Sequence, residues 1–190
     1  TGDDTKSVVE EEARTVEPDV VYVEAGGHKG DMHLGYATAL VTLAKRMDWA
    51  TPPRRPKAVG IVCYLFDRYE GDHAGNLRQL QRLLADVGLE AGPVMLSGTP
   101  WADVQAIAEC GLLVQLPYVG PRAKGLRRLL RKKRTLVETL LPIGLRGSQV
   151  WMQTVARAAG VDLRRAALKG AARARSVEVR LGPYAARLKG

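Results

Sequence analysis

Cysteine, aromatic side chains and long apolar runs are scarce in this sequence, and each shortage excludes a class of protein. The 190 residues include only two cysteines, Cys63 and Cys110, and each lies inside an apolar stretch. Neither has the CxxC or cysteine–histidine spacing of a zinc or iron–sulfur site, so we expect two buried free thiols in a reducing, cytoplasmic setting. No run of about 18 apolar residues is present, and we therefore expect no membrane-spanning helix.

Acidic residues are missing from one part of the chain. The net charge is +9, and aromatic residues make up 5% of the sequence. No Asp or Glu interrupts the basic segment Arg122–Arg134, and no aromatic side chain interleaves with it to stack on nucleic-acid bases. Nucleic acid is therefore a disfavoured partner. Docking of an acidic protein on this predicted helix stays open.

What the sequence does contain is a repeated alternation of strand-like and helix-like segments. Apolar runs predict strands at residues 19–25, 58–66, 93–97, 112–116 and 135–144, the last running into a turn. Helical spacing and capping signals predict helices at residues 34–47, 72–88, 99–110 with Thr99 as N-cap, 121–132, 148–159 and 162–188. We expect the last helix to soften at Gly170 and to stop near Gly182–Pro183.

This alternation, without a two-residue hairpin signal, indicates βαβ units with right-handed crossovers. We therefore predict an α/β fold. Residues 1–190 would form a single three-layer Rossmann-like domain with a parallel sheet of about five strands, helices on both faces and a long C-terminal helix.

In open parallel sheets, ligands bind at the loops that leave the carboxyl ends of the strands, and all three histidines fall in such loops here. A metal site is one use of these loops, with His28, His33 and His73 beside Asp31, Glu70 or Asp72. A phosphate site at Gly26–Gly30 with Lys29, and acid–base work by His73 or Asp67, are two others. None has the spacing of an established motif, and EGDH is equally explained by Asp72 as the cap of a helix.

Four sequence blocks carry a resemblance to a known family. They are GDDTKSVVEEE, VEAGGHKGDMHLGYATAL, AVGIVCYLFDRYEGDHAGNLRQLQRLLADVGLE and LLPIGLRGSQVWMQTVA, and together they span nearly all of the chain. In this order they resemble nitrogenase component I and its relatives, the protochlorophyllide and chlorophyllide reductases and the nickel-sirohydrochlorin cyclase. The resemblance implies a subunit of three Rossmann-like domains, of which residues 1–190 would be a fragment, the middle one.

The resemblance also implies a chemistry for the complete protein. It would receive electrons from an ATP-dependent iron–sulfur reductase component, pair with a homologous subunit in a heterotetramer, and reduce a substrate held between domains. The implied iron–sulfur cluster would be held by cysteines of a preceding domain, so this piece alone would bind no cofactor. Molybdenum–iron proteins carry a cofactor-ligating cysteine near Gln115–Leu116 and a histidine at Tyr36, and both are absent here. A tetrapyrrole-type or unknown substrate is therefore favoured over dinitrogen.

The candidate site residues follow from loop position together with this resemblance. As acid–base candidates we take His33, Asp67 and His73, and as substrate contacts Gly27, His28, Lys29, Tyr36, Glu70, Asp72 and Tyr118. No metal ligand is assigned. The alternative is a non-catalytic Rossmann-type module that binds a small anion or a nucleotide.

Overall fold

The computed structural model describes residues 4–16, 20–24, 28, 30–65 and 71–187. It has an α/β architecture around a four-stranded sheet of order β2-β1-β3-β4, in which every neighbouring pair is parallel. The strands are β1 (Arg55–Val62), β2 (Glu90–Val94), β3 (Cys110–Gln115) and β4 (Thr135–Glu138). The predicted α/β class and the parallel sheet are thus confirmed.

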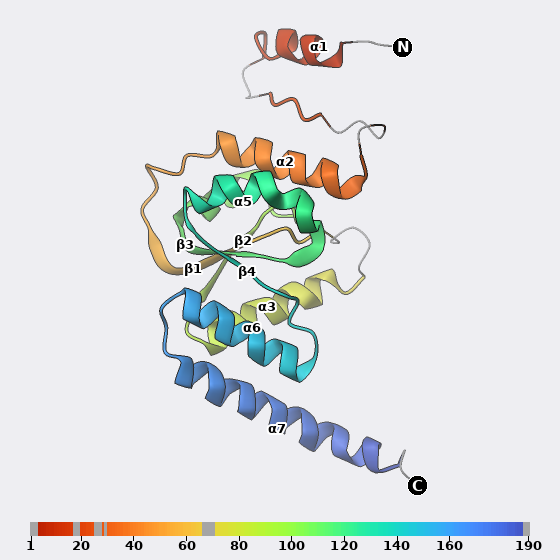
Figure 1. Cartoon of the computed structure of the whole chain (residues 1–190), viewed down its shortest axis with the longest axis vertical. Coiled ribbons are helices and arrows are strands. Elements are labelled where there is room, and N and C mark those ends of the chain that lie inside the picture. The colour runs from red at the N-terminus through yellow and green to blue at the C-terminus, as the bar shows by residue number, and fades with distance from the viewer. Residues whose placement is uncertain (1–3, 17–19, 25–27, 29, 66–70, 188–190) are drawn as a thin grey trace.

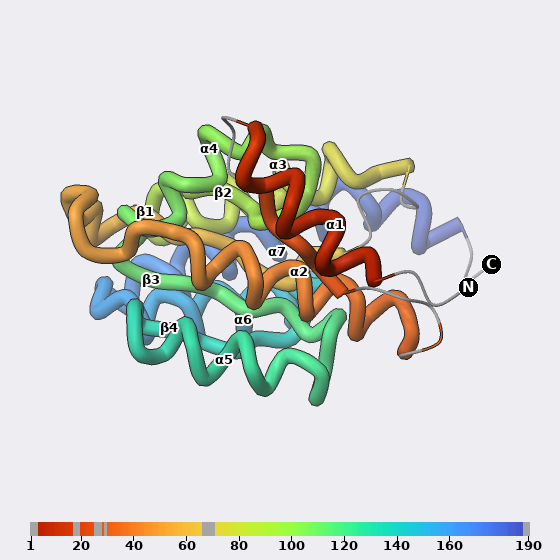
Figure 2. The backbone as a smooth tube through the Cα atoms, turned by 90° about the horizontal axis from the view of Figure 1, so that it is seen from above, coloured from red at the N-terminus to blue at the C-terminus, as the bar shows by residue number. Residues whose placement is uncertain are grey.

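Helices cover both faces of the sheet (Figures 1 and 2). One face carries α2 (Met32–Arg46) and α5 (Lys124–Arg131), and the other carries α3 (His73–Asp86) and α6 (Gly144–Ala158). The long helix α7 (Leu163–Arg187) packs against α6 on the outside. The shorter helices are α1 (Thr5–Glu12), α4 (Trp101–Gln105) and the 3-10 helices η2 (Ala106–Glu109) and η3 (Pro117–Ala123). No helix in the described part of the chain is long and apolar enough to cross a membrane.

Both faces of the sheet are buried, which explains why its central strands read as continuous apolar runs. Along β3, Leu113 packs with the α2 and α5 side chains, whereas Leu112 and Val114 pack with those of α3 and α6. All three are at most 2% exposed. Cys63 and Cys110 are also buried and free, as predicted.

The first predicted strand is wrong. Residues 20–24, the described part of it, form no strand and are half-buried apart from the exposed Glu24. Figure 1 places this segment beyond α2, on the side away from the sheet. Because α2 separates it from the strands, its side chains are partly buried, but its backbone has no neighbouring strand with which to form hydrogen bonds.

Several helix boundaries also differ from prediction; α5 and α6, for example, begin at Lys124 and Gly144 rather than at residues 121 and 148. The helix after β2 starts at Trp101 with Pro100, not Thr99, in the capping position, and it becomes 3-10 after five residues. Helix α7 neither softens at Gly170 nor stops at Gly182–Pro183. Gly170 is buried against α6, where a Cβ would lie 3.1 Å from Gln149 Cγ, so glycine here lets two helices approach closely. Pro183 removes one N–H donor in an exposed part of the helix, where water can satisfy the freed carbonyl.

Candidate functional site

An aromatic and polar cluster lies where β1, β2 and β3 end. Tyr64 follows β1, Ser97 follows β2, Tyr118 follows β3, and His73 begins α3. The Tyr64 and His73 rings stack with centroids 5.0 Å apart, and Tyr118 meets Tyr64 edge-on at 5.5 Å. Three strand ends therefore contribute to one cluster, as the topology of a parallel sheet predicts.

His73 is the most chemically capable member of the cluster. Its Nε2 lies 3.4 Å from the hydroxyl oxygen of Ser97, whose side chain is buried with 4% exposure. Its Nδ1 is buried and has no hydrogen-bond partner among the described residues. An imidazole with one nitrogen engaged and the other uncommitted can accept or donate a proton without first breaking a strong hydrogen bond.

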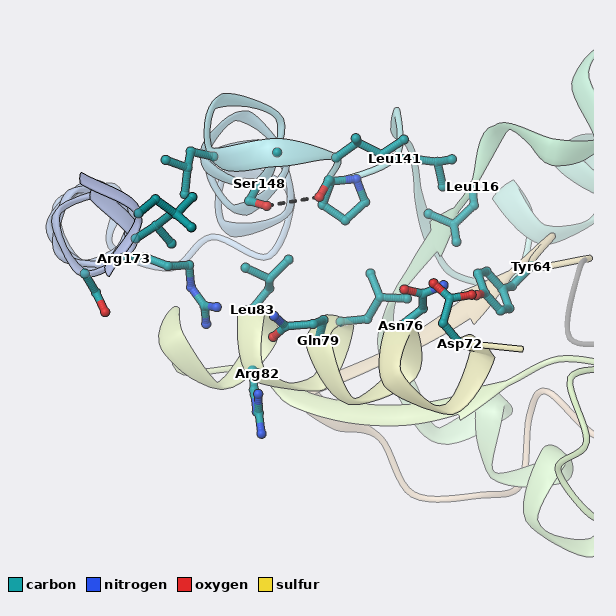
Figure 3. A pocket seen from close by; sticks show the side chains of 18 of the residues that line it. Tyr64, Asp72, Asn76, Gln79, Arg82, Leu83, Leu116, Leu141, Ser148 and Arg173 are labelled. Carbon is teal, nitrogen blue, oxygen red and sulfur yellow. Dashed lines mark hydrogen bonds between the residues drawn. The ribbon is translucent and has the colours of Figure 1, made fainter. Parts of the chain in front are cut away.

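A groove of about 1230 Å³ adjoins this cluster (Figure 3). One wall is α3, the opposite wall is the loop between β4 and α6, and the second half of α7 closes one end. Its lining comprises Tyr64, Asp72, Asn76, Gln79, Leu80, Arg82, Leu83, Leu116, Tyr118, Leu141, Pro142, Ile143, Gly144, Leu145, Ser148, Arg173, Ser176, Val177, Arg180 and Leu181.

The two walls of the groove differ in chemistry. The α3 wall presents polar groups from Asp72, Asn76, Gln79 and Arg82 beside Leu80 and Leu83. The opposite wall is apolar, with Leu141 and Pro142 from the loop and Leu145 from the first turn of α6. The loop is fixed by Ser148, whose hydroxyl donates to the Pro142 carbonyl at 3.0 Å. Such a site suits a ligand with a large apolar body and a few polar groups.

The backbone beside the cluster is strained at two residues. Cys63 and Leu96, which follow β1 and β2, have φ of 63° and 54°, in the left-handed region. For residues with a side chain this region costs roughly 1 to 2 kcal/mol each. The hydroxyl of Tyr36, on α2, lies 3.2 Å from the Tyr64 carbonyl and 3.1 Å from the Met95 carbonyl, one residue from each strained position. Two strained strand ends thus converge on one hydroxyl.

The structure brings some of the predicted site residues together and separates others. Asp72 and Tyr118 line the groove, and His73 lies beside it against Tyr64. Tyr36 reaches the cluster through the two backbone carbonyls and does not line the groove. His33 is half-buried in the first turn of α2, and His28 is exposed in a turn. Gly27, Lys29, Asp67 and Glu70, and with them much of the predicted phosphate loop, lie outside the described residues.

The cap interpretation of EGDH is correct in position and wrong in chemistry. Asp72 occupies the capping position of α3, but its side chain accepts no hydrogen bond from the first turn. Asp31 does cap α2, because its carboxylate accepts from the Leu34 amide at 3.0 Å and pairs with Arg122 at 2.5 Å. That amide, assisted by the arginine charge, lowers the pKa of Asp31. Asp72 therefore lines the groove from the capping position of α3 without a hydrogen bond from its carboxylate to the first turn.

The iron–sulfur cluster implied by the sequence resemblance does not fit the described residues. Cys110 starts β3, whereas Cys63 follows Val62, which pairs with the last residue of β3. Cys63 therefore lies six residue positions beyond Cys110, about 20 Å away along the strand direction at about 3.3 Å per residue. Burial raises the pKa of Cys63 to about 12 and that of Cys110 to about 11, which disfavours the thiolate that binds metal. No three His, Cys, Asp or Glu side chains in the described ranges are grouped to hold a metal.

The basic segment Arg122–Arg134 is partly structural. Arg122 pairs with Asp31, and Arg127 and Arg131 both pair with Glu138 on β4, at 3.1 and 2.7 Å. Arg134 is buried and donates to backbone carbonyls. The remaining cations of the segment, Lys124, Arg128, Lys132 and Lys133, are exposed. Four of the eight cations therefore contribute to the fold, which weakens the sequence argument for a docking surface.

Sequence reasoning missed Tyr64, Ser97 and the apolar wall of the groove. Tyr64 and Ser97 both fell inside predicted strands, at residues 58–66 and 93–97. The wall at Leu141–Leu145 depends on α7 packing outside α6, which no local pattern reveals. The strand-end rule could have found the first two, because they lie two and three residues after the ends of β1 and β2.

Comparison with protein families gives one match, which covers residues 1–190 and is described as Nitrogenase component 1 type Oxidoreductase. The chain matches no curated protein.

Proposed function

The chain belongs to the nitrogenase component 1 type oxidoreductase family, and on that premise we propose that it forms one wall of the substrate cavity of a reductase subunit. The observation that carries this proposal is the groove of about 1230 Å³ beside the strand ends. Substrate would lie against Tyr64 and Tyr118, with the rest of the cavity supplied by other domains or subunits.

The size of the groove favours a large substrate. Sites for drug-sized ligands typically enclose roughly 300 to 1000 Å³, and dinitrogen would occupy only a small part of such a space. A tetrapyrrole-type molecule has the planar apolar body and the few carboxylates that an apolar wall facing amides would accommodate. The residues at the end of β3 support the same choice, because Gln115 and Leu116 stand where a cofactor-ligating cysteine would be required.

Within this cavity we assign roles by contact. Tyr64 and Tyr118 would pack against the ring system of the substrate. His73, which stacks on Tyr64 beside the groove, would donate or accept a proton, and Asp72 would anchor a polar group of the substrate. The described residues offer no ligand set for a cluster, so electron delivery would belong to other parts of the complex. A homologous subunit and an iron–sulfur reductase component are the partners that this role requires.

Binding of a porphyrin by the 190-residue chain tests the cavity. We would titrate the chain with metal-free protoporphyrin IX and follow the shift of its main absorbance band. Leu145→Glu places a carboxylate on the apolar wall and should weaken binding at least about tenfold, or about 1.4 kcal/mol. Val150→Glu is the matched control on α6, since Val150 is exposed and does not line the groove. Absence of binding by the wild-type chain would contradict the proposal, and so would equal effects of the two variants.

The same titration distinguishes the proposed substrate cavity from the alternative function, a non-catalytic module that binds a small anion or a nucleotide. Inorganic phosphate and ATP should neither bind with micromolar affinity nor displace the porphyrin. Tight phosphate or nucleotide binding without porphyrin binding would instead favour the non-catalytic anion module.

The role of His73 is tested by turnover of the complete enzyme. His73→Ala should lower kcat by a factor on the order of 100, as expected when a positioned acid or base is removed. His33→Ala is the comparison, because His33 lies on α2, whereas His73 begins α3 and stacks on Tyr64 at the edge of the groove. Normal turnover of His73→Ala would remove His73 from the mechanism.

A further inference from the structure

We propose that Tyr36 and Ser97 are positioning residues that hold His73 in one orientation and one tautomer at the edge of the groove. The inference rests on the proposed function, because it concerns how the acid–base candidate of that site is held. Neither residue lines the groove. Both act through the strand-end loops, and neither is itself a catalytic residue.

The Tyr36 hydroxyl adds a second link between two loops whose strands are already paired, with the Met95 amide donating to the Ile61 carbonyl at 2.9 Å. It is 3.2 Å from the Tyr64 carbonyl, after β1, and 3.1 Å from the Met95 carbonyl, after β2. A single hydroxyl proton can be shared between two such oxygens in a three-centre hydrogen bond. Tyr36 comes from α2, on the face of the sheet opposite to α3. It therefore holds the two loops from the face that does not carry His73.

Each joined loop carries one contact to His73. The Tyr64 ring stacks on the imidazole, with a 5.0 Å centroid separation and a 30° angle between the planes. The Ser97 hydroxyl is 3.4 Å from Nε2. Movement of either loop would therefore change the surroundings of the imidazole.

The Tyr36 hydroxyl holds the backbone next to two strained residues, Cys63 and Leu96. Leu96 separates Met95 from Ser97, and Cys63 directly precedes Tyr64, and both have positive φ. A non-glycine residue in the left-handed region relaxes toward negative φ unless contacts with its neighbours hold its backbone in place. The hydrogen bonds from Tyr36 act on the carbonyl groups next to these residues, so their loss would let both loops relax and release His73.

Nitrogen-15 NMR of the histidine side chains in the 190-residue chain tests this inference. The sequence has three histidines, so a His73→Gln variant assigns the signals of His73. At about pH 8, where an ordinary histidine is neutral, we expect the wild-type chain to show well-separated Nδ1 and Nε2 signals for His73, as in one tautomer. Tyr36→Phe keeps the ring and removes only the hydroxyl, and should move the two signals toward their midpoint, as in two exchanging tautomers.

Two further variants define the outcomes. Ser97→Ala removes the contact to Nε2 directly and should cause a similar averaging. Tyr184→Phe is the matched control, because it removes an exposed tyrosine hydroxyl on α7 and should leave the His73 signals unchanged. Far-UV circular dichroism identical to that of the wild type would establish that Tyr36→Phe is folded. Unaltered His73 signals in folded Tyr36→Phe would overturn the inference, as would averaged signals already present in the wild type.

The outcome does not depend on porphyrin binding. Averaged signals in Tyr36→Phe, together with no porphyrin binding by the wild-type chain, would support the positioning role and reject the proposed substrate.

Discussion

A buried guanidinium at the amino edge of the sheet has hydrogen-bond partners, whereas two buried polar atoms at the carboxyl edge have none among the residues that the structure describes. Arg134, just before β4, is 6% exposed. It donates from Nε to the Ala108 carbonyl at 2.9 Å and from its two terminal nitrogens to the Trp49 and Lys133 carbonyls at 2.8 and 2.7 Å, and it lies over the Trp49 ring. At the carboxyl edge, His73 Nδ1 and Gln115 Oε1 are buried without partners among the described residues.

The difference separates a buried polar group that holds the fold from buried polar atoms beside the groove that the fold leaves without partners among the described residues. Buried polar groups in native proteins are almost always hydrogen-bonded, and exceptions concentrate at functional sites. The carboxyl edge also carries the two strained residues, Cys63 and Leu96. We therefore interpret the amino edge as structural and the carboxyl edge as the place where stability has been given up for binding.

Arg134→Met should have the largest effect on stability. The change leaves the Ala108 and Trp49 carbonyls without their donor in a buried setting, and should lower the free energy of unfolding by about 3 kcal/mol. Urea denaturation measures it. The matched control is Arg128→Met on the exposed face of α5, which should stay within about 0.5 kcal/mol of wild type. An effect of Arg134→Met no larger than that of the control would contradict the claim that Arg134 stabilises the amino edge of the sheet.

High pH should destabilise the protein through both thiols. Burial raises the pKa of Cys63 to about 12, above its ordinary value near 9.0. Between these values the unfolded thiol loses its proton while the folded one keeps it, so stability falls as pH rises. For Cys63 the loss should reach about 2 kcal/mol between about pH 9 and pH 10.5.

Urea denaturation at several pH values measures this slope. Cys63→Ala, at the carboxyl edge, and Cys110→Ala, at the amino edge, should each flatten it. A slope that neither variant changes would show that these thiols do not carry the effect.

Gln115→Leu should raise stability, opposite in sign to Arg134→Met. Because Gln115 Oε1 has no partner among the described residues, replacing the amide with an apolar side chain of similar size should gain about 1 kcal/mol. Gln105→Leu, at an exposed position of α4, is the control and should change little. A loss of stability in Gln115→Leu would mean that the Gln115 amide forms stabilising hydrogen bonds in the folded protein.

Glu138→Gln should have the smallest effect. The carboxylate pairs with Arg127 and Arg131 at the protein surface. Exposed pairs contribute about 0.2 to 1 kcal/mol and are screened by salt. The difference from wild type in urea denaturation should therefore shrink between low and high salt, and a salt-independent difference would point to packing instead.

Much of the fold could be predicted from the sequence because its signals are local. The continuous apolar run of β3 and the leucine stripe of α3 each determine their own element. Residues 20–24 show the limit, because a β-branched run becomes a strand only where a partner strand is within reach. Gly170 shows it again, since a glycine that interrupts a helix and one that seats it against another helix look alike in sequence.

The site was only half predictable for the same reason. The strand-end rule located Asp72, His73 and Tyr118 because it needs only the order of elements. The groove needs the loop after β4, the exposed face of α3 and the second half of α7 to meet in space. The contacts of Tyr36 need a hydroxyl from a helix on one face of the sheet to reach the Tyr64 and Met95 carbonyls at its carboxyl edge. Neither arrangement has a local sequence signal.

Hydrogen exchange of the 190-residue chain with and without protoporphyrin IX tests the central claim most directly, because it compares both edges in one experiment. The account predicts slower amide exchange in residues 71–83, 116–118, 141–148 and 173–181, which form the groove, and unchanged exchange in residues 45–57 and 130–134 at the amino edge. Protection at the amino edge, or none at all when the porphyrin is in excess, would contradict the assignment of the carboxyl edge as the binding site.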